Sequence, residues 1–311
     1  MPTERLHWSE NSRRPDLTTT VHPAIARLLT NGPVVTDGAW GTLLQSMGLQ
    51  QGECPDAWNT VHPDRVSRVA AAYAEAGSAI VLTNTFRSNP IALAGYGLEA
   101  QTAALNAAGV RASRDAAGKR SFVFASIGPS GAMLAAGEKT ADELRDSFER
   151  QVDALAAAKP DGLVIETMTD LDEALIALAA AKRTSLPVVV SMVFDSGRAR
   201  DRTMTGVTPE AAAKALTAAG ADVIGLNCGI GLDNVPALTA RLRSSTTLPI
   251  WIKPNAGLPV MVDGAARYLT TPEEFARAAS DIVAGGALFI GGCCGTTPDH
   301  IRAVVRALNL A

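Results

Sequence analysis

Cysteine is scarce in this chain of 311 residues, yet two of its four cysteines are adjacent. Cys293 and Cys294 lie in the glycine-rich stretch "GGCCGTTPDH", and Cys228 ends the apolar run "DVIGLNC". In a reducing compartment, few and clustered cysteines indicate metal binding or catalysis rather than structural disulfides. Three thiolates form a soft site that suits zinc and leaves a fourth position open. Such a centre lowers the pKa of a bound thiol but keeps its sulfur nucleophilic, which predicts an enzyme that alkylates a thiol.

The cysteines could also have roles that involve no metal. The vicinal pair could be two small buried residues or a strained redox-active disulfide, and Cys228 could belong to the core. Cys54 lies in the loop sequence "GECPDAW", for which we favour a structural role. The choice depends on where the predicted elements place these residues.

Eight short, continuously apolar runs recur along the chain. They begin at residues 34, 79, 122, 162, 187, 222, 249 and 287. Continuous hydrophobicity indicates strands that are buried on both faces, as in a parallel sheet. Alanine-rich stretches with helical periodicity separate the runs. Three helices are predicted to begin at the proline of a Thr-Pro pair, with Thr208, Thr271 and Thr297 as the N-caps.

Strand followed by helix, repeated eight times, predicts a single α/β domain that is a closed (β/α)₈ TIM barrel. An open doubly wound sheet also alternates, but no GxGxxG motif follows the first run and no composition break marks a second domain. We assign residues 21–311 to the barrel. Residues 1–20 are polar and rich in turn formers, and we expect them to form a flexible N-terminal extension.

In such barrels the chemistry lies at the carboxyl ends of the strands. The polar residues that end the eight runs should therefore gather at one mouth: Asp37, Thr83, Asn84, Ser126, Glu166, Ser191, Asn227, Cys228, Lys253, Asn255, Cys293 and Cys294. The sixth and eighth strands are near neighbours in a ring of eight, so the three cysteines can meet at one metal ion. This placement favours a metal site.

Two acids, Asp37 and Glu166, close apolar runs at this mouth. Acids in such positions lower stability unless a partner neutralises them. A substrate ammonium group is a suitable partner, and an amino-acid thiol would bring one. The turn "DGAWG" can also present backbone N–H groups to a carboxylate. The alternative is that Asp37 caps the following helix and Glu166 pairs with a neighbouring lysine.

The bulk composition excludes several partners. The net charge is −3 and no dense cluster of lysine and arginine occurs, which argues against nucleic acid and anionic membranes. The longest apolar runs are about eight residues, too short to span a bilayer. The polar N-terminus lacks the apolar core of a secretory signal, so we expect a cytoplasmic protein.

These motifs resemble the homocysteine S-methyltransferase family, the homocysteine-binding barrels of methionine synthases and betaine–homocysteine methyltransferases. The matching stretches cover nearly the whole chain: "DGAWGT", "AGSAIVLTNTF", "SIGPSG", "IETMTDLDEA", "IGLNCG", "KPNAGLP" and "GGCCGTTPDHI". The resemblance implies a (β/α)₈ barrel in which Cys228, Cys293 and Cys294 hold zinc. The homocysteine thiolate then becomes the fourth ligand and attacks a methyl group, which gives methionine.

The resemblance also implies a substrate pocket. The family's acids on the substrate amino group match Asp37 and Glu166, and its carboxylate-binding turn matches Gly38 and Ala39. Many members have Asp-Gly-Gly here, whereas this chain has alanine followed by the bulky Trp40, to which we assign no role. We expect three further residues to line the pocket: Asn84, Ser126 and Asn227.

The methyl donor has two candidates. "CCGTTPDHI" and "PNAGLP" resemble the methionine-synthase branch, and no folate or cobalamin module follows within the chain. This leads us to expect a stand-alone homocysteine module of a split methionine synthase, which takes its methyl group from methylcobalamin on a separate corrinoid protein. The alternative is direct transfer from betaine, dimethylsulfoniopropionate or S-methylmethionine. Direct transfer needs an aromatic cage, and four aromatic residues lie near predicted strand ends: Trp40, Phe86, Phe194 and Trp251.

Two other classes stay open. A non-catalytic zinc- or thiol-binding barrel would bind zinc without transferring methyl groups, and the acid pair argues against it because a pure metal site needs no amino-acid pocket. A metal-free lyase or aldolase could use Lys253 as a Schiff-base lysine, although "KPNAGLP" fits a tight turn better.

Overall fold

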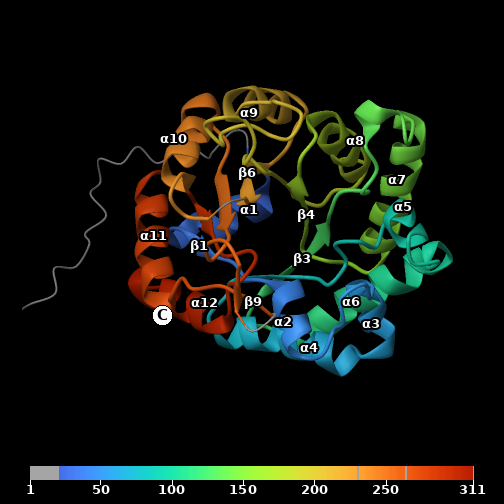
Figure 1. Cartoon of the computed structure of the whole chain (residues 1–311), viewed down its shortest axis with the longest axis horizontal. Coiled ribbons are helices and arrows are strands. Elements are labelled where there is room, and N and C mark those ends of the chain that lie inside the picture. Colours follow the sequence, from blue (N-terminus) through green and yellow to red (C-terminus); the bar gives the residue numbers. More distant parts are fainter. Residues whose placement is uncertain (1–20, 230, 263–264, 311) are drawn as a thin grey trace, which may run out of the picture.

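Eight parallel strands pair around a closed ring, as the sequence predicted (Figure 1). The computed structural model describes residues 21–229, 231–262 and 265–310, so the expected extension at residues 1–20 lies outside the described residues. The strand order is β1-β10-β7-β6-β5-β4-β3-β2, and a parallel bridge between Thr36 and Ile80 joins its two ends. The ring strands are β1 (Val34–Val35), β2 (Ile80–Leu82), β3 (Phe122–Ile127), β4 (Gly162–Met168), β5 (Val188–Met192), β6 (Val223–Cys228), β7 (Ile250–Pro254) and β10 (Phe289–Ile290).

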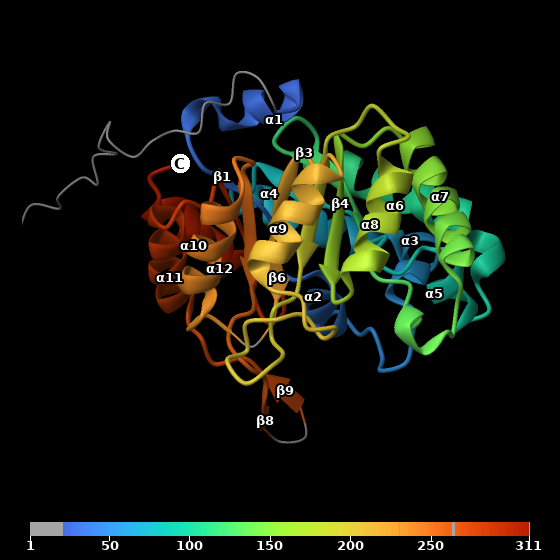
Figure 2. The same cartoon turned by 90° about the horizontal axis from the view of Figure 1, so that it is seen from above.

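Helices surround this ring on the outside, except the first, which lies across one end of the barrel (Figures 1 and 2). They are α1 (Pro23–Leu28), α2 (Trp40–Ser46), α3 (Trp58–Val61), α4 (Pro63–Glu75), α5 (Pro90–Ala94), α6 (Thr102–Ala117), α7 (Ala141–Ala157), α8 (Leu171–Ala181), α9 (Pro209–Ala218), α10 (Val235–Ser245), α11 (Pro272–Ala284) and α12 (Pro298–Ala307). Short 3₁₀ turns are η1 (Leu29–Asn31), η2 (Pro55–Ala57), η3 (Glu99–Gln101) and η4 (Leu134–Ala136). No helix in the described part of the chain is long and apolar enough to cross a membrane.

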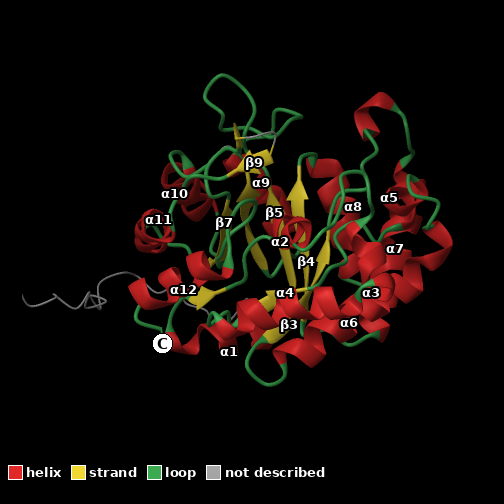
Figure 3. Cartoon of the chain, turned by 60° about the horizontal axis from the view of Figure 1, so that its bottom comes forward, coloured by secondary structure: helices red, strands yellow, loops and turns green. Residues whose placement is uncertain are grey.

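The two ends of the barrel differ. An antiparallel hairpin, β8 (Val260–Val262) and β9 (Ala265–Arg267), projects from one end, and α1 lies across the other (Figure 2). The loops that follow the strands gather on the side of the hairpin (Figure 3). That side is therefore the carboxyl end of the barrel, where the sequence placed the chemistry.

The predicted Thr-Pro helix starts are confirmed. Thr208 accepts a hydrogen bond from the first turn of α9. Thr271 and Glu274 form a reciprocal capping box at α11, with the Thr271 N–H donating to the carboxylate at 2.9 Å. At α12, the Thr297 N–H donates to Nδ1 of His300 at 3.2 Å. These caps satisfy N–H groups that a helix start leaves without partners.

An apolar floor fills the interior of the barrel. Buried side chains from the strands, from α1 and from η1 form one cluster there: Ile25, Leu29, Val34, Ile80, Leu82, Phe124, Val164, Val189, Val223, Trp251 and Phe289. Successive side chains on a strand point to opposite faces, so the residue two positions after each floor residue also points inward. On β3, β4 and β7 these next inward residues are Ser126, Glu166 and Lys253. The period of the strand thus sets a polar layer directly on the apolar floor.

Gly225 makes the close packing of β6 on β7 possible. It is paired with Trp251 on the neighbouring strand, and a Cβ atom at residue 225 would lie 1.7 Å from the Trp251 carbonyl oxygen. No side chain fits there without moving β7, and β7 carries residues of the polar layer.

We expect Gly225→Ala to lower the free energy of unfolding by about 3 kcal/mol or more, because overpacking against a backbone cannot be relieved by a rotamer change. Gly41→Ala is the control, since a Cβ atom there meets nothing within 4 Å. Chemical denaturation of both variants measures the difference. Equal stability of the two variants would contradict this role of Gly225 in β6–β7 packing.

Candidate metal centre and substrate pocket

Three cysteine side chains lie together at the carboxyl end of the barrel. Their Sγ atoms are all within 4.8 Å of one another. Cys228 is the last residue of β6, the other two follow β10, and β7 lies between these strands. Two hydrogen bonds fix the chain after β10 to the end of β7, from Cys293 N to Pro254 O at 2.8 Å and from Ala256 N to Cys294 O at 2.9 Å. The structure thus brings together the three cysteines that the sequence assigned to one site.

One cysteine of this cluster and one neighbouring residue have a left-handed backbone. Cys228 has φ 63° and Thr167 has φ 62°, a conformation that non-glycine residues adopt at a cost and that clusters at functional sites. The pairing of β4 with β5 shifts register between Ile165 and Met168, which frees Thr167 from the regular ladder. The Asn227 side chain provides the hydrogen-bond partners that Thr167 lacks in the strand ladder. Its Oδ1 accepts from Thr167 N at 2.8 Å, and its Nδ2 donates to Thr167 Oγ1 at 2.7 Å. Asn227, expected in the pocket, therefore braces the strand ends.

The three thiols control one another's ionisation. Hydrogen bonds from Cys293 and Cys294 lower the pKa of the Cys228 thiol to about 3. Their contact with Cys228 raises the pKa of Cys294 to about 11 and that of Cys293 well above its ordinary value. The three thiols therefore do not ionise independently, because a negative charge on Cys228 opposes the ionisation of Cys293 and Cys294.

The Asn255 side chain lies against the cysteine cluster. Its Nδ2 donates to Cys228 Sγ at 3.6 Å and to Gly229 O at 2.6 Å. Its Oδ1 is buried and has no hydrogen-bond partner among the described residues, which is costly unless a further group binds it. The three clustered thiols fit a soft or borderline metal ion such as zinc. Sequence reasoning placed Asn255 at the mouth without a role, and only the fold brings its side chain against Cys228.

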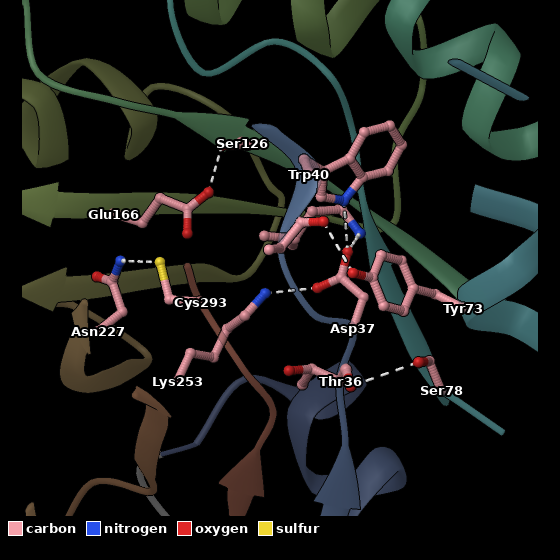
Figure 4. A network of polar contacts seen from close by, with 12 residues as sticks. Thr36, Asp37, Trp40, Tyr73, Ser78, Ser126, Glu166, Asn227, Lys253 and Cys293 are labelled. Atoms are coloured by element: carbon pink, nitrogen blue, oxygen red, sulfur yellow. Dashed lines mark hydrogen bonds and ion pairs between the residues drawn. The ribbon is translucent and has the colours of Figure 1, made fainter. Parts of the chain in front are cut away.

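Glu166 lies at the irregularity in β4, near the cysteines (Figure 4). It is 8% exposed, and its Oε1 accepts a hydrogen bond from Ser126 Oγ at 2.5 Å. Burial raises the pKa of Glu166, while Lys253 and the Ser126 hydroxyl oppose the rise. Ser126, expected in the pocket, thus orients this carboxylate.

Asp37 is fully buried and forms an ion pair with Lys253 (Figure 4). Lys253 Nζ lies 2.5 Å from Asp37 Oδ1. Asp37 Oδ2 accepts from Trp40 Nε1 and from Leu82 N, both at 2.7 Å. Burial lowers the pKa of Lys253, but the carboxylates of Asp37 and Glu166 outweigh it, so the net shift is upward. The lysine partner that we considered for Glu166 is thus found on Asp37, and Trp40 acquires a role as a donor to it.

The turn at Gly38 and Ala39 packs tightly against Thr296 and Tyr73. The Ala39 N–H donates to Thr296 Oγ1 at 3.0 Å, and Tyr73 OH donates to Ala39 O at 2.8 Å. A Cβ atom at residue 38 would lie 2.7 Å from Thr296 Oγ1 and 2.8 Å from the Tyr73 ring. The Ala39 N–H is therefore engaged within the protein, and the binding of a substrate carboxylate at this turn stays a prediction.

Asn84 fixes a neighbouring loop. Its Nδ2 donates to Pro55 O at 2.8 Å and to Asn59 Oδ1 at 2.9 Å. It therefore ties the end of β2 to the segment that precedes α4, and its place in the substrate pocket stays a prediction. Cys54 is buried in a small apolar cluster with Leu93 and Leu105, in keeping with the structural role we favoured.

Tyr268, which follows the hairpin, is a residue that sequence reasoning missed. A Cβ atom at Gly295 would lie 2.1 Å from Tyr268 Cγ, so glycine is needed for the ring to approach the cysteine loop. Burial and the neighbouring cysteines raise the pKa of Tyr268 to about 12. Only the fold of the hairpin reveals this contact.

The fold and the site define a (β/α)₈ barrel with a three-cysteine centre at its carboxyl end. The family model for homocysteine S-methyltransferase matches residues 34–308. The chain therefore belongs to the homocysteine S-methyltransferase family.

Similar proteins agree with this family. The methionine synthase of Mycobacterium leprae (strain TN) is 30% identical over 294 residues, which are 88% of this chain and 24% of that protein. The methionine synthase of Mycobacterium tuberculosis (strain ATCC 25618 / H37Rv) is 29% identical over 300 residues, which are 90% of this chain and 25% of that protein. The chain thus spans about a quarter of the length of these two relatives.

A solved structure matches over nearly its whole length. The crystal structure of the homocysteine methyltransferase MmuM from Escherichia coli, in its metallated form, has a TM-score of 0.75 and 26% identity. The match covers 92% of this chain and 99% of that chain.

We expect the purified protein to bind about one zinc ion per chain through the three cysteines. Loss of an outer partner of a metal ligand already weakens metal binding by about 10- to 100-fold, so Cys228→Ser should weaken zinc binding by at least about 100-fold. Cys54→Ser is the matched control and should retain the metal. Mass spectrometry of bound metal and competition with a chromogenic chelator provide the measurement. Full zinc retention by Cys228→Ser would contradict the three-cysteine centre.

Proposed function

We propose that this protein is a zinc-dependent methyltransferase that methylates the thiol of homocysteine to give methionine. The observation that carries the proposal is the position of three cysteine sulfur atoms within 4.8 Å of one another, in the same mouth as the buried carboxylate of Glu166. Family membership and the similarity to a metallated homocysteine methyltransferase support it.

The cysteines supply the charge that thiol activation requires. Three thiolates around a divalent ion leave a net charge of about −1 and soft, electron-rich ligands. Zinc held in this way would lower the pKa of a substrate thiol while leaving its sulfur nucleophilic. In this protein, Asn227 and Asn255 each direct an amide donor to a cysteine sulfur, at 3.9 Å and 3.6 Å, and so hold the sulfur atoms in position.

Glu166 gives the site its preference for an amino acid. The carboxylate is buried, and Ser126 holds one of its oxygen atoms. An ammonium group that pairs with Glu166 in this setting forms a charge-assisted hydrogen bond, which is among the stronger polar contacts. A thiol that also carries an α-ammonium group would therefore reach the carboxylate and the metal centre together.

For the methyl donor, we propose a methyl group carried by a separate corrinoid protein. Direct transfer from an onium compound needs several aromatic faces around the cation. Of the four aromatic residues near strand ends, Trp251 lies in the apolar floor and Phe194 packs in the outer core, both buried. Trp40 is bound to Asp37, and Phe86 is half-buried. The burial of Trp251 and Phe194 removes two of the four candidates for a cage, and the similarity to methionine synthases supports a corrinoid donor.

The proposal is tested by offering the zinc-loaded protein homocysteine with a panel of donors: methylcobalamin, free or protein-bound, betaine, dimethylsulfoniopropionate and S-methylmethionine. We expect methionine from protein-bound methylcobalamin and little from the others, as measured by mass spectrometry. Cys54→Ser should keep this activity, and Cys228→Ser should lose at least about 100-fold.

Each of the remaining outcomes of the panel has a distinct meaning. Methionine from an onium donor would replace the corrinoid donor by direct transfer while leaving the methyltransferase assignment intact. Zinc binding without methionine from any donor would favour the non-catalytic thiol-binding barrel.

A further inference from the structure

Lys253 is the one lysine or arginine that is buried in the described part of the chain. It is 2% exposed and follows Trp251 by two residues on β7, so it stands directly on the apolar floor. Its Nζ lies 5.9 Å from the centre of the Trp251 ring. Lysine is almost never fully buried without an anionic partner. The lysine therefore depends on a particular carboxylate in the polar layer.

That carboxylate is Asp37, and its hydrogen-bonding capacity is largely used. Lys253 Nζ contacts its Oδ1 at 2.5 Å. Trp40 Nε1 and Leu82 N both donate to its Oδ2. With 0% exposure, Asp37 offers no surface to a ligand.

The carboxylate of Glu166 has fewer hydrogen-bond partners among the described residues than that of Asp37. It is 8% exposed, and the one hydrogen bond to its carboxylate from a described residue comes from Ser126, to Oε1. The Lys253 side chain extends between Glu166 and Asp37, and its contact is with Asp37 (Figure 4). Glu166 thus keeps an oxygen atom available at the mouth.

We propose that Lys253 is a positioning residue that determines specificity: it neutralises Asp37 from inside the barrel and leaves Glu166 as the only carboxylate that receives the substrate ammonium group. This inference rests on the proposed function. It predicts one ammonium subsite where two acids alone would have formed a doubly negative one.

Exchange of the two cations is unfavourable. If a substrate ammonium group displaced Lys253 from Asp37, the lysine would be left buried without a partner, and an unpaired buried charge is strongly destabilising. The ammonium group would also have to enter a position that has no exposed surface. Pairing with Glu166 requires neither change, so the Asp37–Lys253 pair stays closed while substrate binds.

The test compares homocysteine with desamino-homocysteine, the same thiol acid without its amino group, by titration calorimetry of the zinc-loaded protein. Because a hydrogen bond to a charged group strengthens binding, we expect the wild type to bind homocysteine about 10- to 100-fold more tightly than desamino-homocysteine. Glu166→Gln should abolish this ratio. Lys253→Met alone leaves Asp37 without its cation and should raise the ratio, because the ammonium group then meets two carboxylates. The double variant Asp37→Asn with Lys253→Met removes the internal pair without changing net charge, and it should keep the wild-type ratio.

The inference would be overturned if the double variant lost its preference for homocysteine over desamino-homocysteine as completely as Glu166→Gln does. Equal binding of both thiols by the wild type would also overturn it while leaving thiol binding, and thus the proposed function, intact. Binding of neither thiol by the wild type would overturn the proposed function and this inference with it.

A crystal structure of the wild type with homocysteine tests the same point if the double variant does not fold. We expect the substrate nitrogen within hydrogen-bond distance of Glu166, with Lys253 still paired to Asp37. A substrate nitrogen bound to Asp37, with Lys253 displaced, would overturn the inference.

Discussion

The constraint on which this structure depends is that three cysteine thiols at one place cannot all ionise without a cation. Their sulfur atoms lie within 4.8 Å of one another, and the pKa values of Cys293 and Cys294 are raised while that of Cys228 is lowered. The barrel creates this situation, because β7 separates the strands that carry the cysteines by only one position. A divalent metal ion, as proposed for this site, would offset the repulsion between the three thiolates.

A second group of interacting charges lies next to the three cysteines. The mouth also contains two buried carboxylates, and the protein supplies one internal cation, Lys253, which pairs with Asp37. Glu166 lies beside the cysteine cluster and accepts a hydrogen bond from Ser126. The barrel thus separates a closed ion pair, which stabilises the polar layer, from an open carboxylate that can receive a ligand.

Much of this arrangement follows from local patterns in the sequence. The eight apolar runs specify the parallel strands, and the strand period of two carries each run from the floor, as at Val164, to a polar residue at the mouth, as at Glu166. Side-chain partners across the barrel were not predictable in this way. Lys253 and Asp37 are 216 residues apart, and strand pattern indicates that both face inward without saying which carboxylate the lysine meets. The buried oxygen of Asn255, which has no hydrogen-bond partner among the described residues, likewise depends on three-dimensional packing.

In the mechanism proposed here the substrate thiol joins the three cysteines at zinc, and X-ray absorption at the zinc edge measures this step itself. We expect three sulfur neighbours in the zinc-loaded protein and four after homocysteine is added. Cys228→Ser, loaded at high zinc concentration, should have one fewer in each state. A zinc environment that keeps three sulfur neighbours in the presence of saturating homocysteine would contradict ligation of the substrate thiol.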